Sequence, residues 1–193
     1  MAAPYLEGRG IDLGIAEEFR CGVIVAPHSG HESYVGRLAI PSIGPNGVYQ
    51  MKFRCMGDHE CKDLGHSKYL TDAMDNRLFN VRAIVSASNV ICVTEGELDS
   101  VVLTMCGFPS VAAPGSNTWK RHHPRMFAGF TKVYVFGDGD KAGQAFSKTV
   151  ADSMGNSVRL VMPEGEDVNS LYVSAGVEGI YEIMGVDGGD SYI

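Results

Sequence analysis

The chain has 193 residues, of which 45% are hydrophobic, so it is long enough to bury the cores of one or two small domains. Its 16 basic and 23 acidic residues give a net charge of −7, which counts against tight, autonomous DNA binding unless the acids are concentrated in one metal site. No apolar run approaches the length of a membrane span, and the N-terminus lacks the basic segment and apolar core of a signal peptide.

The first part of the chain predicts a short helix followed by a β-rich unit. Asp12 is placed to cap the helix. Three extended runs then predict strands, at residues 23–25, 37–41 and 48–54. Lys52 and Arg54 are two residues apart, so they fall on the same face of the last strand. Taken alone, this pattern favours a solvated strand face.

Two thiols and two imidazoles follow in the pattern C-x3-H-x-C-x4-H: Cys55, His59, Cys61 and His66. Such a set can form a tetrahedral zinc site. The spacing matches no common zinc pattern, however, and a ligand pair separated by one residue is strained in tetrahedral geometry. The alternative is a polar loop with incidental His and Cys, and we expect on this basis that the cluster is not an essential zinc site.

From residue 90 onward, strands and helices are predicted to alternate. Apolar, β-branched runs bounded by glycine are typical of buried strands in a parallel sheet, and they occur at residues 90–93, 133–136 and 158–161. Between them, apolar residues recur at helical spacing: Leu98, Val101, Val102 and Met105, and then Phe146, Val150 and Met154. This alternation predicts a parallel α/β sheet.

Each of the three runs leads to a carboxylate beside glycine: Glu95, then Asp138 and Asp140, then Asp167. Ligands of parallel sheets bind beyond the carboxyl ends of the strands, so we expect these acids to lie together. Acids as close as Asp138 and Asp140 repel each other unless a cation is bound, and carboxylate oxygens suit Mg²⁺. Glu95 alone is explained equally well as a helix N-terminal acid. Together, the three motifs predict metal-assisted phosphoryl or nucleotidyl transfer.

The motifs resemble those of DnaG-type bacterial and phage primase catalytic cores, which contain a Toprim domain. Residues 95–99 look like the EGxxD motif, residues 138–143 like DGDxAG, and residues 165–171 like GEDPDxL, with Asn169 in place of the last acid. Near the N-terminus the chain also resembles the YLxxRGI segment of these cores.

The resemblance implies a small α+β subdomain at residues 1–87, followed by a Toprim parallel-sheet domain at residues 88–193. It implies a DNA-directed RNA polymerase of the primase type, which makes short RNA primers on single-stranded DNA from NTPs with Mg²⁺ or Mn²⁺. The implied catalytic residues are Glu95, Asp138 and Asp140, and Asp167 joins them as an implied metal ligand. The implied nucleic-acid and NTP-binding residues are Arg9, Arg37, Lys52, Arg54, Lys68 and Lys141.

Two other functional classes would keep this fold. A Toprim-family metal-dependent nuclease is disfavoured by the primase-like first half, and a non-catalytic nucleic-acid-binding module is disfavoured by the intact acids. The resemblance begins shortly after Met1, so the usual zinc-binding module is expected to be missing from this chain. Two alternatives follow: an excised domain, or a short phage-type primase whose partners, such as a replicative helicase, are separate polypeptides. Five cysteines, an odd number, favour a reducing cytoplasm, that of the host if a phage encodes the protein.

Overall fold

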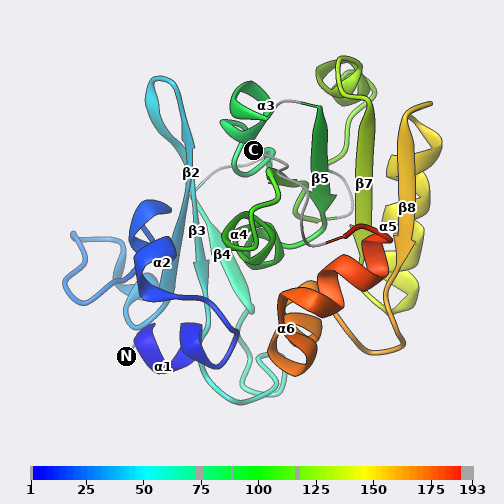
Figure 1. Ribbon diagram of the computed structural model, residues 1–193. Helices are drawn as coiled ribbons and strands as arrows, with labels where there is room; N and C mark the ends of the chain where they lie inside the picture. The colour runs from blue at the N-terminus through cyan, green and yellow to red at the C-terminus, as the bar shows by residue number, and fades with distance from the viewer. Residues whose placement is uncertain (1, 73–75, 88, 116–117, 188–193) are drawn as a thin grey trace. The chain divides into compact units, whose positions relative to one another are not determined.

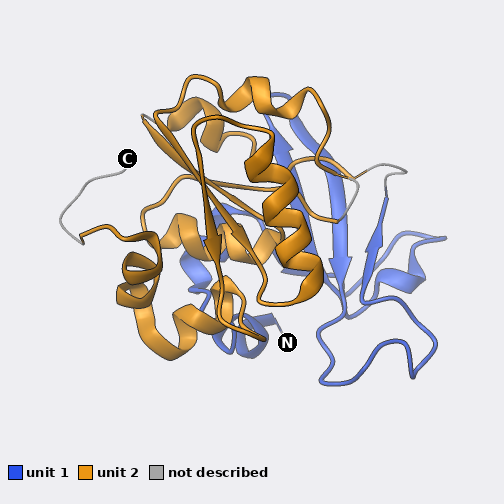
Figure 2. Cartoon of the chain, turned by 90° about the vertical axis from the view of Figure 1, so that its right-hand side faces the viewer, with its two compact units in different colours: residues 1–75 blue, residues 76–193 orange. Residues whose placement is uncertain are grey.

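The computed structural model describes residues 2–72, 76–87, 89–115 and 118–187. The chain forms two compact units, residues 1–75 and 76–193 (Figure 2). The division falls before residue 76, whereas the sequence analysis places it after residue 87. The intervening segment belongs with the second unit because Leu78 and Ala83 are buried in the core of that unit.

The first unit is built on an antiparallel sheet with the strand order β1-β2-β3-β4 (Figure 1). The strands are β1 (Gly22–Val23), β2 (Leu38–Gly44), β3 (Gly47–Arg54) and β4 (Tyr69–Thr71). β2 and β3 form a hairpin in which Leu38 pairs with Arg54. The two longer predicted strands are therefore confirmed.

In the described part of the first unit, residues 2–72, the helices are α1 (Ala2–Glu7), α2 (Leu13–Glu18) and the 3₁₀ helix η1 (Glu32–Tyr34). Asp12 caps α2 as predicted, because its carboxylate accepts hydrogen bonds from the backbone N–H groups of Gly14 at 2.7 Å and Ile15 at 3.3 Å. Tyr34 stacks on Phe53 of β3 with their ring centroids 3.9 Å apart, which anchors η1 to the sheet.

The second unit is built on a parallel sheet with the strand order β6-β5-β7-β8. Its strands are β5 (Val90–Thr94), β6 (Ser110–Ala112), β7 (Lys132–Gly137) and β8 (Ser157–Val161). Its helices are α3 (Ala83–Ser86), α4 (Glu97–Met105), η2 (His123–Phe127), α5 (Lys141–Asp152) and α6 (Val168–Met184). The predicted fold class, a parallel α/β sheet preceded by a small α+β unit, is confirmed.

The central strands of the parallel sheet are covered on both faces. Ile91, Cys92 and Val93 are each 0% exposed, although consecutive side chains of a strand point to opposite faces. One face packs against α5 through Phe146 and Val150. α4 and α6 lie on the other side of the sheet (Figure 1). Cover on both faces explains why the sequence of these strands is apolar without alternation.

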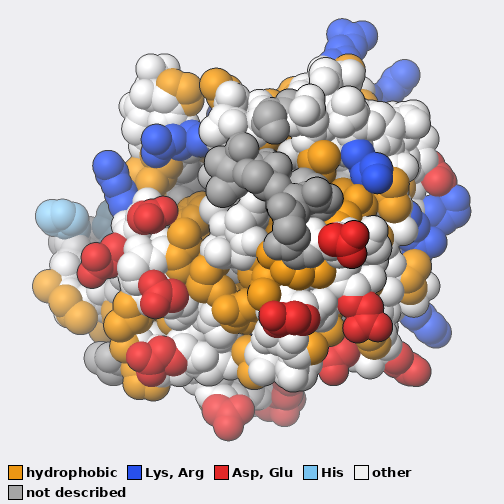
Figure 3. Space-filling model, in the orientation of Figure 1, with side chains coloured by type: hydrophobic (Ala, Val, Ile, Leu, Met, Phe, Trp, Pro, Cys, Tyr) orange, Lys and Arg blue, Asp and Glu red, His pale blue; other side chains and the backbone are white. Residues whose placement is uncertain are grey.

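The surface carries charges of both signs. Both acidic and basic side chains are visible on the face drawn in Figure 3. Within the described ranges, none of the helices is long and apolar enough to cross a membrane.

Candidate metal centre and basic hollow

The carboxyl ends of β5 and β7 form the centre of the candidate site. From β5 the chain runs through α4 to β6 at one edge of the sheet, and from β7 it runs through α5 to β8 at the other. The direction of the chain across the sheet therefore reverses between β5 and β7, which is where ligands of such sheets bind. Glu95 follows β5 and Asp138 follows β7, and the pairing of Val93 with Val135 brings these two strand ends together.

The negative charge of the Glu95 carboxylate is poorly stabilised by the groups around it. Its Oε2 atom is buried and has no hydrogen-bond partner among the described residues. Burial raises the pKa of Glu95 to about 7, and the charges of Asp138 and Asp140 contribute to the increase. A partly dehydrated carboxylate beside two further acids is the environment that a divalent cation relieves. These residues therefore fit Mg²⁺ or Mn²⁺, which prefer oxygen ligands.

Two glycines allow the turn after β7 to pack closely. A Cβ atom at Gly139 would collide with the backbone oxygen of Pro163, and one at Gly143 would collide with the backbone of Asp138. The backbone N–H of Gly139 also donates to the carbonyl oxygen of Glu166 at 2.7 Å. The turn that carries the second acidic motif thus lies directly on the turn that carries the third, and only residues without a side chain permit this contact.

Asp140 and Asp167 have a structural role that the sequence analysis did not predict. Asp140 caps α5 by accepting a hydrogen bond from the N–H of Gly143 at 2.7 Å. Asp167 caps α6 by accepting one from the N–H of Ser170 at 2.7 Å, and the Ser170 hydroxyl accepts one from the N–H of Asp167 at 2.9 Å. Because a carboxylate has two oxygens, each acid can cap its helix and still offer an oxygen to a cation.

Asp99 was not among the predicted ligands, although it belongs to the same site. It lies in α4 with 6% of its surface exposed, and its carboxylate accepts a hydrogen bond from the N–H of Asn169 at 3.2 Å. Asp99 therefore connects the first acidic motif to the third. The signal was present in the sequence, because Asp99 is the last residue of the motif that begins at Glu95.

Three of the six predicted cations, Arg9, Arg54 and Lys68, line one hollow of the first unit, which has a volume of about 690 Å³. We call it the basic hollow and define it by its cations and the ring beside them: Tyr5, Arg9, Arg54, Lys62 and Lys68. The acids Asp58 and Glu60 line it as well. Sequence reasoning missed both Tyr5 and Lys62 as members of this hollow, although Tyr5 is the first residue of the YLxxRGI-like segment; Lys62 lies in no recognised motif.

Lys52 and Arg54 are buried, with 8% and 7% of their surfaces exposed, so the interpretation of a solvated strand face is wrong. Aromatic rings cover them: the Arg54 guanidinium lies 5.1 Å from the ring centroid of Tyr69 and 5.8 Å from that of Tyr5, and the Lys52 ammonium lies 5.7 Å from Tyr69. Arg54 also donates to the Tyr69 hydroxyl. Its Nε has no hydrogen-bond partner among the described residues, which leaves a buried donor for an anion.

The remaining two predicted cations lie elsewhere. Arg37 donates from Nη1 to the carbonyl oxygen of Ser67 at 3.0 Å and from Nε to that of Ser33 at 3.2 Å, so it holds two loops of the first unit. Lys141 is the exposed first residue of α5 in the second unit, next to Asp140.

Comparison with known proteins identifies relatives of this chain. Residues 92–172 match a family described as Toprim-like. The gene 57 protein of Mycobacterium phage D29 is 37% identical over 155 residues, which cover 77% of this chain and 98% of that protein. A DNA primase of Chlamydia trachomatis is 31% identical over 121 residues, which cover 60% of this chain and 20% of that protein.

Solved primase structures share the fold over nearly the whole chain. The zinc-binding and RNA polymerase domains of the Aquifex aeolicus primase match with a TM-score of 0.73 at 20% identity, over 95% of this chain and 55% of that one. The RNA polymerase domain of Mycobacterium tuberculosis DnaG, in complex with a double-stranded DNA oligomer with a 6-nucleotide overhang, matches with a TM-score of 0.72 at 20% identity, over 95% and 72%. The chain thus spans about half the length of the Aquifex structure and a fifth of the chlamydial primase.

The raised pKa of Glu95 predicts a pH-dependent effect of Glu95→Gln on stability. The folded state holds the Glu95 proton more tightly than the unfolded state, so ionisation destabilises the fold as pH rises from about 4.5 to about 7. Without divalent cations, Glu95→Gln should therefore be more stable than wild type at pH 8 by about 1–3 kcal/mol, with a smaller difference at pH 5. Urea unfolding at both pH values measures this, with exposed Glu178→Gln as the control. A difference independent of pH would contradict it.

Asp167 allows capping to be separated from metal binding. Asn caps helices as well as Asp, so Asp167→Asn should leave the free energy of unfolding nearly unchanged, whereas Asp167→Ala should lower it by about 1 kcal/mol. If Asp167 also holds the metal, Asp167→Asn should weaken Mn²⁺ binding in calorimetry. Asp12→Asn, at the cap of α2, is the matched control. Unchanged Mn²⁺ affinity in Asp167→Asn would leave this residue a helix cap alone.

Proposed function

Because the chain belongs to the family of the Mycobacterium phage D29 gene 57 protein and has the fold of a DnaG-type primase catalytic core with a Toprim-like domain, we propose that it synthesises short RNA primers on a single-stranded DNA template. The named primase of Chlamydia trachomatis supports this activity, since it is 31% identical over the matched region. The structure of M. tuberculosis DnaG in complex with DNA supports DNA as the partner.

One observation carries the proposal: a buried carboxylate oxygen without a partner among the described residues, at the point where the strand order reverses. Glu95, Asp138 and Asp140 meet there, and Asp167 begins the helix that follows the next strand. A nucleotidyltransferase needs such a cluster, because the reaction brings the negative charges of triphosphates and a developing alkoxide into one place. Capping of α5 accounts for Asp140 alone, whereas the mutual repulsion of the three acids destabilises the turn unless a cation offsets it.

The metal in this proposal is Mg²⁺ or Mn²⁺, held by Glu95, Asp138 and Asp140 with Asp167 as a further ligand. When bound there, it supplies Lewis-acid stabilisation of the charge that develops as a 3′-hydroxyl attacks an α-phosphate. The contribution of the chain is to hold the carboxylates in place before substrate arrives. The tight packing of the turns at Gly139 and Gly143 and the caps on α5 and α6 limit the movement of these acids.

The basic hollow is the proposed site for nucleic-acid or triphosphate phosphates. Arg54 offers a buried, permanently charged guanidinium with an unused Nε donor, and Lys68 is exposed at the hollow. The Tyr5 ring positions two cations of the hollow, because the guanidinium groups of Arg9 and Arg54 lie 5.2 and 5.8 Å from its centroid. Lys52 and Arg37 act indirectly in this proposal: the former packs on Tyr69, and the latter holds the backbone at Ser67, beside Lys68.

The direct test is incubation of the protein with single-stranded DNA and labelled NTPs in the presence of Mg²⁺ or Mn²⁺. The proposal expects labelled oligoribonucleotides whose formation depends on both template and metal. Shortened DNA would instead identify a nuclease. The absence of both products, on templates that include every trinucleotide, would identify a binding module.

Asp138→Asn combined with Asp140→Asn should abolish primer synthesis and weaken Mn²⁺ binding without unfolding the protein. The fold should survive because Asn at position 140 can still cap α5, and repulsion around Glu95 falls. Thermal unfolding without divalent cations should be at or above the wild-type midpoint. Calorimetry of Mn²⁺ binding provides the check, and wild-type affinity in this variant would refute the metal assignment.

Lys68→Ala should weaken binding to single-stranded DNA of any sequence, because it removes a cation that neutralises a phosphate. The slope of log affinity against log salt should become shallower by about 0.7 for each phosphate of a single strand that is no longer neutralised. Mn²⁺ affinity should stay at the wild-type value. Lys148→Ala, which alters an exposed lysine of the second unit that does not line the hollow, is the control. Filter binding at several salt concentrations measures both variants, and equal slopes for wild type, Lys68→Ala and Arg54→Ala would remove nucleic-acid binding from the hollow.

A further inference from the structure

The connection between β3 and β4, residues 55–68, is a long loop without regular secondary structure. Its ends meet where the N–H of Cys55 donates to the carbonyl oxygen of Lys68 at 2.8 Å. Cys61 is its only buried residue, so apolar packing contributes little to its conformation. Irregular loops of this length are uncommon in compact domains unless something else holds them or they have a function.

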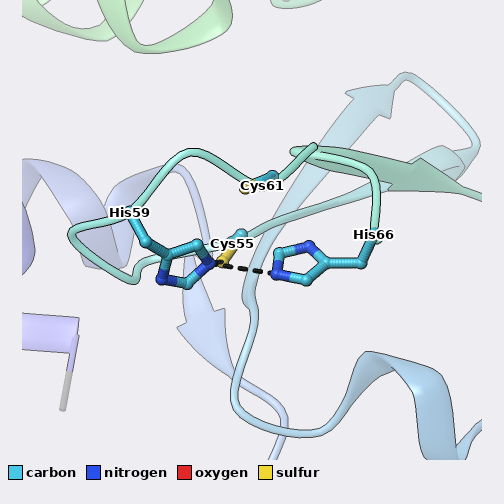
Figure 4. A group of neighbouring side chains, drawn as sticks. All are labelled: Cys55, His59, Cys61 and His66. Atoms are coloured by element: carbon cyan, nitrogen blue, oxygen red, sulfur yellow. Dashed lines mark hydrogen bonds between the residues drawn. The ribbon is translucent and has the colours of Figure 1, made fainter. Parts of the chain in front are cut away.

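Four side chains of this loop, all of kinds that can ligate a metal ion, converge on one point (Figure 4). The Sγ atoms of Cys55 and Cys61 and a ring nitrogen each of His59 and His66 all lie within 4.8 Å of one another. Nε2 of His59 is 3.0 Å from Nε2 of His66 and 3.6 Å from Sγ of Cys55. In the figure the two imidazoles point toward each other, with the Cys55 thiol between them.

The two shorter separations, 3.0 and 3.6 Å, are close to those of ligands around a tetrahedral zinc ion. Zinc–sulfur and zinc–nitrogen bonds of about 2.3 and 2.0 Å at tetrahedral angles place two nitrogens about 3.3 Å apart and a nitrogen and a sulfur about 3.5 Å apart. Hydrogen bonding explains the cluster less well. A neutral imidazole nitrogen either donates or accepts a single hydrogen bond, yet Nε2 of His59 is close to both His66 and Cys55.

The backbone of the loop leaves room for this convergence. A Cβ atom at Gly57 would collide with the imidazole of His59, so only glycine there allows the ring its position. The chain also bends over residues 57–59. A histidine side chain reaches farther from its Cα atom than a cysteine side chain. Because the backbone bends here, the imidazole of His59 and the thiol of Cys61 can therefore reach the same centre from Cα atoms at different distances from it. The strain expected from their spacing is thereby avoided.

We propose that Cys55, His59, Cys61 and His66 bind one Zn²⁺ ion. This replaces the expectation drawn from the sequence spacing alone. Four protein ligands complete a tetrahedral shell and leave no open position for water or substrate, so the ion is structural rather than catalytic. It crosslinks a loop that buries little apolar surface, and its binding free energy stabilises the folded loop.

The ion would also shape the basic hollow. All four ligands line that hollow together with Arg9, Arg54 and Lys68, so the metal-bound loop forms one of its walls. Zinc loss should therefore reduce single-stranded DNA affinity even though no phosphate-binding cation is removed. This second consequence rests on the proposed function, whereas metal content does not.

Elemental analysis of the whole chain, purified under reducing conditions without added metal, tests the proposal. Wild type should contain one zinc per chain, and Cys55→Ser and His66→Ala should contain almost none. Cys106→Ser, which alters a half-buried cysteine of α4's C-terminal cap, and His28→Ala, which alters a histidine outside the loop, are the matched controls and should keep the zinc. A chelator should lower the thermal unfolding midpoint of wild type and of both controls but not that of Cys55→Ser.

Replacement of zinc by Co²⁺ in wild type keeps the test decisive even if a variant fails to fold. A tetrahedral site with two thiolates should give intense visible absorption and a sulfur-to-cobalt charge-transfer band. Wild type that takes up neither zinc nor cobalt, or a Cys55–Cys61 disulfide found by mass spectrometry in the reduced preparation, would overturn the proposal. Zinc loss with unchanged DNA affinity would leave the metal site intact and refute only its link to the basic hollow.

Discussion

The candidate metal centre depends on the parallel pairing of β5 with β7. Both strands are apolar and covered on both faces, so neither can carry a charged side chain along its buried length. Charged groups are therefore confined to the strand ends, and the pairing register determines which ends meet. A shift of one residue would turn every buried side chain to the other face, so the core that holds the register also holds Glu95 beside the turn with Asp138.

The same sequence features that predict the fold also predict the acids, because both follow from uninterrupted apolar runs. Glu95 and Asp138 could be located without a structure, since each follows such a run. The capping role of Asp140 and Asp167 could not be predicted with the same ease. An acid before a helix is consistent with a cap, with a metal ligand or with both, and only the hydrogen bonds to Gly143 and Ser170 identify the capping role.

Other features depend on contacts that sequence spacing does not encode. Alternation places Lys52 and Arg54 on one strand face, but their burial depends on Tyr5 and Tyr69, which come from other elements. The convergence of Cys55, His59, Cys61 and His66 depends on a bend in the chain and on space beside Gly57. A comparison with common ligand patterns cannot detect a site whose geometry arises from the local path of the backbone.

The burial of Arg54 has a consequence for the thermodynamics of anion binding. A surface arginine loses its hydration shell and the freedom of its side chain when it binds a phosphate, and both losses weaken the complex. Arg54 is already dehydrated between two rings and held by a hydrogen bond to Tyr69. Its hydration and its side-chain entropy are therefore lost during folding, before any ligand binds. An anion at its Nε would interact through a low-dielectric environment that counter-ions enter poorly. Arg54 would thus act as a rigid binding group for one phosphate. Exposed Lys68 would instead attract phosphates at longer range, and salt would screen this attraction, so it would weaken as the ionic strength rises.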